Sequence, residues 1–292
     1  MKNILYKLIN KIGYRIENKN KIKASQRASL KRFNISENFE LLFKSRNFIN
    51  ELENKFPDLK IKNHNDGFVL SFSDIKIYVE SVEEFYIINE VFIEEEYKFK
   101  TPERVVLIDI GTNIGTASLF FSLLDNVEKI YCFEPVLDTY NQAKYNFSIN
   151  ESAKKVVAVN NFGLGKNDRD EIFIFDKQVK GNTGVRGKMS SSYSNNSTTE
   201  EVNVKIKSAS SEIQKIMDSN SNSKIVVKMD CEGAEYEIFE SLTSDIISHI
   251  DVFMIEWHDK GSKTIEDILL KNGFNLFLKD LAPNAGIIYA SK

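Results

Sequence analysis

The stretch VVLIDIGTNIGTASLFFSLLDNVEKIYCFEP, residues 105–135, decides the fold of this 292-residue chain. Its first six residues form an apolar, β-branched run, which is typical of a strand buried on both faces. A turn with two glycines follows, and apolar positions then recur at helical spacing through Leu124. Residues 129–133 indicate a second buried strand, which ends at the acidic Glu134. The stretch therefore predicts half of a nucleotide-binding βαβ unit.

The turn after the first strand has the composition of a ligand-binding loop. Gly111 and Gly115 let the backbone approach a ligand at points where a Cβ would be in the way. Free N–H groups at the start of the following helix can bind a carboxylate or a phosphate. Glu134 lies about 20 residues beyond the turn, where an acidic side chain can accept hydrogen bonds from ribose hydroxyls. The pattern predicts a ligand that contains a ribose.

Two ribose-containing cofactors compete for this loop, a dinucleotide and S-adenosylmethionine. The dinucleotide fingerprint is G-x-G-x-x-G, whereas here Asn113 takes the place of the second glycine. Asp109 adds a carboxylate at the strand end, which would repel a pyrophosphate but attract the ammonium group of an amino acid. S-adenosylmethionine carries such a group and no phosphate. The residues favour this methyl donor, and NAD(P) stays open as the alternative.

Four blocks of the sequence together resemble the FkbM family of S-adenosylmethionine-dependent methyltransferases. They are D-I-G-T-N-I-G at 109–115, F-E-P at 133–135, K-M-D-C-E-G-A-E at 228–235 and I-E-W-H at 255–258. The likeness covers the chain from about residue 90 onward, and the third block is the most specific to the family. The resemblance implies a class I methyltransferase fold and the methylation of a hydroxyl on a sugar or a polyketide-like product.

The remaining elements predict an α/β fold with a mostly parallel, seven-stranded, Rossmann-like sheet. Strands and helices alternate through the second half of the chain, and two last strands at 274–278 and 286–290 predict a C-terminal antiparallel hairpin. Such a hairpin separates a methyltransferase sheet from a dinucleotide-binding sheet. The predicted regions are a basic amphipathic helix and linker at 1–33, an N-terminal α+β cap at 34–100 and a class I S-adenosylmethionine-dependent methyltransferase domain at 101–292.

The cap is predicted from three patterns. Residues 36–56 have helical spacing of apolar side chains, residues 68–79 alternate as a β-hairpin, and residues 83–98 return to helical spacing. Further on, residues 177–201 are rich in Gly, Ser, Thr and Asn. Loops this long without secondary structure are usually lids or disordered segments, and we favour a lid over the acceptor.

Ligands of open α/β sheets bind beyond the carboxyl ends of the strands, and several polar residues are expected there. The predicted donor-binding residues are Asp109, Gly111, Asn113, Gly115, Glu134, Asn161 and Asp230. Methyl transfer to a hydroxyl requires an acceptor held in line with the methyl group and a base that removes its proton. The candidate catalytic residues are Asp230, His258 and Glu232. An imidazole has the ordinary pKa best suited to a base, although a structural histidine is equally compatible with the pattern.

No metal site is predicted from the sequence. Asp230, Glu232 and Glu235 form an acidic cluster that could give Mg²⁺ one or two carboxylates. Glu235 would equally stabilise the N-terminus of its own helix. Cys132 and Cys231 lack metal-ligand spacing, and two such thiols in a long chain indicate a reducing compartment.

Charge is unevenly distributed along the chain. Residues 1–33 contain ten basic residues and one acidic residue, whereas the remainder contains 29 basic and 41 acidic residues. Residues 2–12 predict a basic amphipathic helix, which would lie in a membrane interface or dock on the protein's own surface. Residues 18–32 read as a solvated linker, and because they lack aromatic side chains for base stacking, no nucleic-acid partner is predicted. We expect a cytoplasmic protein without signal peptide or membrane span, with peripheral contact at the inner membrane face left open.

The sequence thus predicts an S-adenosylmethionine-dependent O-methyltransferase. A sugar hydroxyl of a glycan or glycan precursor as acceptor is implied by the family resemblance alone. One alternative is an NAD(P)-dependent Rossmann enzyme acting on a nucleotide sugar. The other is a non-catalytic S-adenosylmethionine-binding module, in which the acidic residues at the strand ends would be idle.

Overall fold

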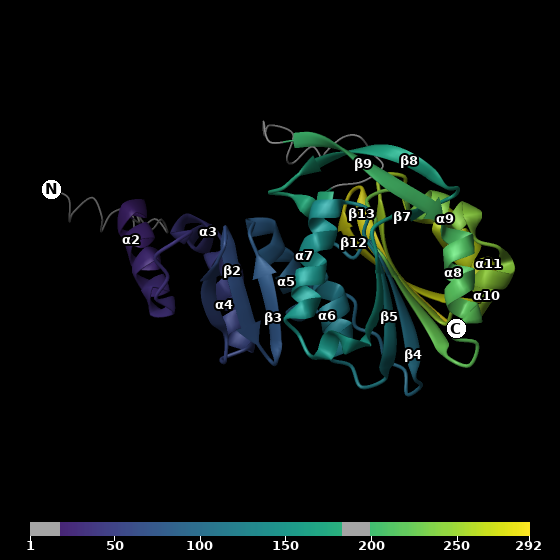
Figure 1. Cartoon of the computed structure of the whole chain (residues 1–292), viewed down its shortest axis with the longest axis horizontal. Coiled ribbons are helices and arrows are strands. Elements are labelled where there is room, and N and C mark those ends of the chain that lie inside the picture. The colour runs from purple at the N-terminus through teal and green to yellow at the C-terminus, as the bar shows by residue number, and fades with distance from the viewer. Residues whose placement is uncertain (1–17, 183–198) are drawn as a thin grey trace, which may run out of the picture.

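A computed structural model describes residues 18–182 and 199–292, and within them a seven-stranded sheet forms the centre of the molecule (Figure 1). The strand order is β12-β13-β11-β10-β4-β5-β6. The neighbours β11, β10, β4, β5 and β6 pair in parallel, whereas β13 is antiparallel to both β11 and β12. This order confirms the predicted class I methyltransferase fold with its C-terminal hairpin. The strands are β4 (Val105–Ile110), β5 (Val127–Phe133), β6 (Val156–Asn160), β10 (Lys224–Met229), β11 (Val252–His258), β12 (Asn275–Ala282) and β13 (Ala285–Ser291).

Both faces of this sheet are covered, which is why its central strands are continuously apolar. Along β4, Val105 and Leu107 belong to one hydrophobic cluster, and Val106 and Ile108 belong to the cluster on the opposite face. Figure 1 shows helices on both sides of the sheet. The first face packs against α6 (Thr116–Ser122) and α7 (Leu137–Ser148), and the second against α8 (Ala209–Asp218), α9 (Glu235–Ser241), α10 (Ser244–His249) and α11 (Lys263–Lys271).

A small second sheet lies next to the main one. Its order is β7-β9-β8, and β8 pairs antiparallel with β9. A short 3-10 helix, η3, follows β8. The predicted lid at 177–201 overlaps η3 and the first residues of β9, and its residues 183–198 lie outside the described part of the chain. The elements are β7 (Gly163–Gly165), β8 (Arg169–Asp176), η3 (Lys180–Asn182) and β9 (Thr199–Ser208).

The predicted cap is an antiparallel three-stranded sheet with helices beside it. The expected hairpin is present as β2 and β3, but the helix expected over residues 36–56 is divided into α3 and α4 at the buried Ser45. β1 was not predicted. Ile61 is the one buried residue of this strand, so its sequence has no alternating apolar pattern. The elements are α3 (Phe39–Lys44), α4 (Arg46–Lys55), β1 (Lys60–His64), β2 (Gly67–Phe72), β3 (Ile75–Val79) and α5 (Val82–Phe92).

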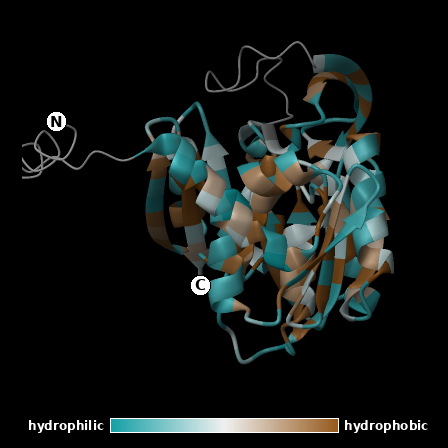
Figure 2. Cartoon of the chain, turned by 90° about the vertical axis from the view of Figure 1, so that its left-hand side faces the viewer, coloured by the Kyte–Doolittle hydropathy of each residue, from teal (hydrophilic) through white to brown (hydrophobic). Residues whose placement is uncertain are grey.

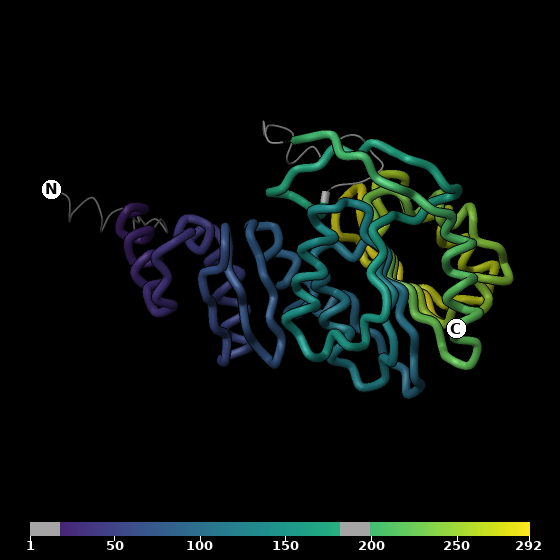
Figure 3. The backbone as a smooth tube through the Cα atoms, viewed as in Figure 1, coloured from purple at the N-terminus to yellow at the C-terminus, as the bar shows by residue number. Residues whose placement is uncertain are grey.

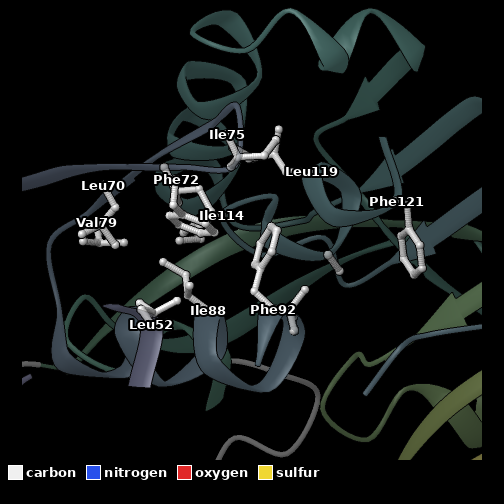
Figure 4. Packing of buried hydrophobic residues seen from close by; sticks show 14 of the residues in the cluster. Leu52, Leu70, Phe72, Ile75, Val79, Ile88, Phe92, Ile114, Leu119 and Phe121 are labelled. Carbon is white, nitrogen blue, oxygen red and sulfur yellow. The ribbon is translucent and has the colours of Figure 1, made fainter. Parts of the chain in front are cut away.

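The cap and the methyltransferase sheet share one hydrophobic core. Figure 4 shows Ile88 and Phe92 of α5 beside Ile114 and Leu119 from the loop and helix that follow β4. The Phe92 ring lies 5.6 Å from the ring of Phe120 in an edge-to-face arrangement. Each large side chain buried here stabilises the contact by about 1.5–3 kcal/mol. The tube in Figure 3 shows the cap alongside α6 and α7.

The linker predicted at residues 18–32 is wrong, because these residues form α2 (Lys19–Leu30) and the 3-10 helix η1 (Lys31–Phe33). The Asn18 side chain caps α2 by accepting hydrogen bonds from two backbone N–H groups. Leu30 is 1% exposed, and the Arg27 guanidinium lies over the Phe43 ring. α2 therefore depends on the Asn18 cap and on one buried side chain, Leu30. A helix with a single buried residue has no repeating hydrophobic pattern from which it could be predicted. The predicted helix at 2–12 lies outside the described residues.

Most large apolar side chains of the described residues are buried, although Leu137, Ile172 and Phe277 are more than half exposed. Figure 2 shows brown, hydrophobic stretches along the strands and teal, hydrophilic stretches on outer helix turns and loops. Across residues 18–182 and 199–292, none of the helices combines the length and hydrophobicity that a membrane crossing requires.

Candidate active site

Polar side chains follow the hydrophobic ones along three neighbouring strands, β4, β10 and β11. Leu107, Val226 and Met254 belong to the cluster on the cap side of the sheet. Side chains alternate along a strand, so the residues two positions further on point to the same side. These residues are Asp109, Lys228 and Glu256, and Asp230 and His258 follow two positions later. The pattern of the strands thus gathers a polar cluster between the sheet and the cap.

Asp109 and Lys228 form a buried ion pair beneath the glycine turn. The two residues are register partners on β4 and β10, and Lys228 Nζ lies 3.3 Å from Asp109 Oδ1. Lys228 also donates a hydrogen bond to the Gly111 carbonyl, and Ser118 Oγ donates one of 2.6 Å to Asp109 Oδ2. Burial raises the pKa of Asp109 in spite of these partners. Asp109 therefore supports the turn from below. It does not line the pocket beside Glu134 that is described below, whereas its neighbour Ile110 does.

The glycine turn passes very close to the end of β10. Gly111 has φ +78°, and a Cβ on it would come 1.7 Å from the Asp230 carbonyl oxygen. Gly115 has φ +89°, and its Cβ would come 2.7 Å from the Phe147 ring, so it allows the turn to pack on α7. Both positions require glycine because of the protein's own packing, whereas the prediction was that they make room for a ligand. Gly111 lines the candidate site, whereas Gly115 packs behind it.

Glu134 occupies the end of β5 and is 7% exposed. Its Oε2 accepts a hydrogen bond of 3.0 Å from the Asn113 N–H, and its Oε1 accepts one of 2.9 Å from the Val136 N–H. Burial raises the pKa of Glu134 to about 7, against the opposing effect of these two N–H groups. Each carboxylate oxygen can accept a further hydrogen bond, such as one from a ribose hydroxyl. Asn161 donates to the carbonyl oxygens of Glu134 and Pro135, so it braces this loop from outside the pocket.

A pocket adjoins Glu134, and the empty space in it, counted together with the open solvent at its mouth, is about 610 Å³. Polar groups from the strand ends form one side of it, and apolar side chains from β5 and the small sheet form another. The lining that matters here consists of Gly111, Asn113, Glu134, Leu164, Phe173 and Ile206. A carboxylate beside an apolar wall fits the ribose and the purine of S-adenosylmethionine.

A second pocket lies between the sheet and α5. It shares Gly111, Asn113, Gly181, Asp230 and Glu232 with the first pocket, so the two are contiguous. Its wall is rich in carboxylates from the cap and the strand ends. The polar residues of this acceptor pocket include Glu83, Glu90, Tyr97, Asp230, Glu256 and His258. Burial raises the pKa of Glu90 to about 8.

Asp230, Glu256 and His258 meet on the floor of the acceptor pocket. The Tyr97 hydroxyl lies 3.3 Å from Asp230 Oδ2 and 3.3 Å from Glu256 Oε2. His258 Nε2 lies 3.5 Å from Glu256 Oε1 and 3.7 Å from Glu232 Oε1. Burial, together with the charge of Asp230, raises the pKa of Glu256 well above its ordinary value. The three predicted catalytic residues, Asp230, Glu232 and His258, thus all line this pocket.

Glu235 lies behind His258, away from the pocket. It is fully buried, and its Oε1 lies 3.2 Å from His258 Nδ1. The same oxygen accepts hydrogen bonds from the N–H groups of Cys231 and Gly233. Burial raises the pKa of Glu235 to about 7. Glu235 is the first residue of α9, the helix whose N-terminus it was considered to stabilise. Its carboxylate is oriented toward the imidazole of His258.

The sequence analysis missed two residues that connect the cap to the site, Tyr97 and Lys180. Lys180 is 4% exposed, and its Nζ lies 2.7 Å from Glu80 Oε1 and 3.1 Å from Glu84 Oε1. The next residue, Gly181, donates its N–H to Glu83 on α5. Tyr97 lies in the segment 83–98 that was predicted to be helical, but α5 ends at Phe92. Lys180 lies in the predicted lid, and neither residue belongs to a motif. Only the packing of the cap shows that they adjoin the strand ends.

Comparisons with known proteins agree with this architecture. The family model described as the methyltransferase FkbM domain matches residues 109–276. The chain is similar to Methyltransferase 1 of Beauveria bassiana (strain ARSEF 2860), with 27% identity over 240 residues, which cover 77% of this chain and 93% of that protein.

Two solved structures are among the matches. Methyltransferase FkbM from Methylobacillus flagellatus KT has 12% identity and a TM-score of 0.45, covering 92% of this chain and 58% of that one. Precorrin-6y C5,15-methyltransferase from Geobacter metallireducens GS-15 has 14% identity and a TM-score of 0.38, covering 70% of this chain and 89% of that one.

Proposed function

Because the chain belongs to the methyltransferase FkbM family, we propose that it is an O-methyltransferase that modifies a sugar hydroxyl of a glycan or glycan precursor. Its methyl donor is S-adenosylmethionine. The observation that carries the proposal is the meeting of two contiguous pockets at Asp230, one suited to the donor and one lined with polar groups. A methyl group and an acceptor held on either side of this point would be in line for transfer.

In this proposal, the donor pocket holds S-adenosylmethionine, which supplies a methyl group activated by its sulfonium. Glu134 accepts hydrogen bonds from the ribose, and the apolar side chains Leu164 and Phe173 flank the purine. The turn at Gly111 and Asn113 directs the rest of the donor toward Asp230. Of the seven predicted donor-binding residues, four line the donor pocket: Gly111, Asn113, Glu134 and Asp230. Asp109, Gly115 and Asn161 lie outside its lining and support the loops that form it.

The composition of the acceptor pocket favours a polyhydroxylated acceptor. Carboxylate and tyrosine oxygens accept the hydrogen bonds that sugar hydroxyls donate, and a sugar has many such hydroxyls. The reacting hydroxyl would lie near Asp230, Glu232 and His258, one of which takes its proton. With Glu235 opposite Nδ1, the His258 ring is oriented with Nε2 toward the pocket.

Calorimetric titration tests the donor part. S-adenosylmethionine should bind in the micromolar range and NAD should not, whereas binding of NAD alone would overturn the proposal. Glu134→Ala should weaken donor binding by about 10- to 100-fold, the value of hydrogen bonds to a charged group. Glu128→Ala removes a half-exposed glutamate from the same strand and serves as the matched control. Equal losses of donor affinity in the two variants would refute the role of Glu134. Unchanged donor binding in both variants would support the alternative of a non-catalytic binding module, in which the acidic residues at the strand ends are idle.

The acceptor part needs a separate assay. The protein is incubated with S-adenosylmethionine and a panel of simple glycosides, and mass spectrometry detects the gain of a methyl group. O-methylated sugar supports the proposal. Methylation of phenols or amines in a parallel panel, with no sugar modified, would overturn the sugar acceptor and leave methyl transfer intact.

We also propose a cytoplasmic location, peripheral contact with the inner membrane face through residues 2–12 and no nucleic-acid partner. Two observations support the location: Cys132 and Cys231 are both free thiols, and Cys132 is buried. Cosedimentation of the full chain with anionic vesicles, compared with a chain lacking residues 2–12, tests the membrane contact. Equal cosedimentation of the two chains would refute it.

A further inference from the structure

We propose that Asp230, Glu256 and His258 bind a divalent metal ion on the floor of the acceptor pocket, and that an acceptor hydroxyl completes the coordination. The first part is independent of the reaction, whereas the second rests on the proposed function. Of these three residues, only Asp230 belongs to the acidic cluster considered from the sequence, where no metal site was predicted. What brings these three residues together is strand packing, because Glu256 and His258 lie on β11 and Asp230 follows the adjacent β10.

The geometry of the three side chains fits a shared cation. One ligand atom from each residue lies within 4.8 Å of the other two. With bonds of about 2.0–2.2 Å, neighbouring ligands of a metal ion lie roughly 3–3.6 Å apart and opposite ones about 4.2 Å apart. The 3.5 Å between His258 Nε2 and Glu256 Oε1 therefore suits two neighbouring ligands. A further carboxylate, that of Glu232, lies 3.7 Å from the same nitrogen.

The orientation of His258 is the second, independent observation. Its side chain is 8% exposed, and its Nε2 points toward carboxylate oxygens at distances beyond hydrogen-bond length. Among residues 18–182 and 199–292, no group forms a hydrogen bond with this nitrogen. On the other side of the ring, Nδ1 lies 3.2 Å from the buried Glu235. A carboxylate that accepts from one ring nitrogen and so directs the other toward a metal is the usual support of a histidine ligand.

The charge of the pocket also calls for a cation. Asp230, Glu256 and Glu232 converge with further carboxylates on the cap side. The nearest buried ammonium group is that of Lys228, which lies 3.3 Å from Asp109 and 3.7 Å from Asp230. The Tyr97 hydroxyl contacts one oxygen of Asp230 and one of Glu256 and so holds both side chains in place. A divalent ion here would offset part of the negative charge that Asp230 and the neighbouring carboxylates bring together.

The donor set indicates the kind of metal. One imidazole with two carboxylates suits Mn²⁺, Fe²⁺ or Zn²⁺ better than Mg²⁺, which prefers oxygen ligands alone. Three protein ligands leave positions open for an acceptor oxygen. A hydroxyl bound to such an ion loses its proton more readily, so Asp230 and His258 would act as ligands and the nearby Glu232 would take the proton.

The test is the binding of Mn²⁺ alone, without donor or acceptor, to the full chain after treatment with a chelator. Calorimetry and the electron paramagnetic resonance of free Mn²⁺ should show one site. Glu256→Gln and His258→Asn keep the approximate shape of each side chain and should each weaken Mn²⁺ binding at least tenfold. Glu235→Gln should weaken it by about 10- to 100-fold, as loss of a supporting carboxylate typically does.

Two controls separate coordination from a general negative field. Glu83→Gln removes a carboxylate from the same pocket but outside the cluster, and His249→Asn makes the same histidine change at an exposed site. Both should keep the Mn²⁺ affinity of the unmodified protein within twofold. S-adenosylmethionine binding by each variant shows that it is folded, since the donor pocket does not include Glu256 or His258.

Mn²⁺ binding weaker than millimolar would overturn the proposal, as would equal losses in Glu83→Gln and Glu256→Gln. These results are distinguishable from failure of the proposed function. A protein that binds Mn²⁺ with the expected variant pattern but methylates no hydroxyl retains the metal site and refutes the reaction. Methyl transfer that persists in the presence of the chelator, in a protein that shows no Mn²⁺ site, retains the reaction and refutes the metal site.

Discussion

Lys228 Nζ lies 3.3 Å from Asp109 Oδ1, and the two residues face each other as register partners in the middle of the sheet. Lys228 is 3% exposed and Asp109 is fully buried. Removing two charges from water is costly, so neither residue would be tolerated there without the other. The pair also holds the glycine turn, because Lys228 donates to the Gly111 carbonyl.

Lys228→Met should destabilise the protein by about 3–5 kcal/mol, because it leaves the Asp109 carboxylate buried without its partner. Urea unfolding followed by circular dichroism measures the loss. Adding Asp109→Asn to the same chain should recover much of the stability. Lys224→Met removes an exposed lysine at the start of the same strand and should change the free energy of unfolding by less than about 1 kcal/mol. Similar losses in the two single variants would contradict this account.

Gly111→Ala should abolish donor binding and strongly destabilise the fold, because the new Cβ would lie 1.7 Å from the Asp230 carbonyl oxygen. Gly261→Ala is the matched control, since Gly261 has nearly the same φ, +77°, but no atom within 4 Å of its Cβ position. The control should lose only about 1 kcal/mol from backbone strain. Thermal melts and calorimetry with S-adenosylmethionine compare the two. Equal losses in the two variants would show that position 111 requires glycine because of its positive φ, and not because of the close approach of the Asp230 carbonyl oxygen.

Donor affinity should fall as the pH drops through about 7, because burial raises the pKa of Glu134 to about 7 and only its carboxylate accepts two hydroxyls. Binding should be about tenfold weaker at pH 6 than at pH 8. The contribution to stability has the opposite sign: a raised pKa favours the protonated form in the fold, so ionisation weakens the fold as the pH rises toward 7. Titrations at both pH values measure the affinity. Glu134→Gln should bind weakly and without this slope, and a slope that survives in the variant would assign it to another group.

Lys180→Met should lower the free energy of unfolding by about 3–5 kcal/mol, because Glu80 and Glu84 would lose the cation between them. Donor affinity should fall as well, since Lys180 and Gly181 line the donor pocket. Lys177→Met is the control: Lys177 is about half exposed and lies 3.5 Å from the same Glu80. Chemical denaturation and calorimetry report the two quantities. A control that loses as much as Lys180→Met would show that Glu80 does not need a buried partner.

The central sheet could be predicted from the sequence because each of its inner strands is buried on both faces. β4 and β10 are rich in β-branched residues, and apart from Lys224 at the start of β10 all their residues are buried. The strand ends were predictable for the same reason, so Glu134, Asp230 and His258 were placed correctly at one edge. α2 was missed because its stability depends on the Asn18 cap and on Leu30 rather than on a repeating pattern.

The contacts within the site were less predictable, because they depend on register and on the cap. The sequence places Asp109 at a strand end, but only the pairing of β4 with β10 shows that Lys228 already neutralises it. Likewise, the orientation of Glu235 toward His258 depends on how α9 packs beside β11. Tyr97 lies in the segment 83–98 that was predicted to be helical, but it follows the end of α5 at Phe92, and no motif points to it.

The sharing of one hydrophobic core between the cap and the sheet bears on how this enzyme could change its acceptor. The family match begins at residue 109, whereas α5 and Tyr97, which form one wall of the acceptor pocket, precede it. Under the proposed function, substitutions on that wall would change the acceptor preference, because none of its residues lines the donor pocket. Because Phe92 of α5 is packed against Phe120, however, the wall cannot be exchanged as a separate module. New acceptor preferences would have to arise by changing the polar side of α5 while its apolar side stays fixed.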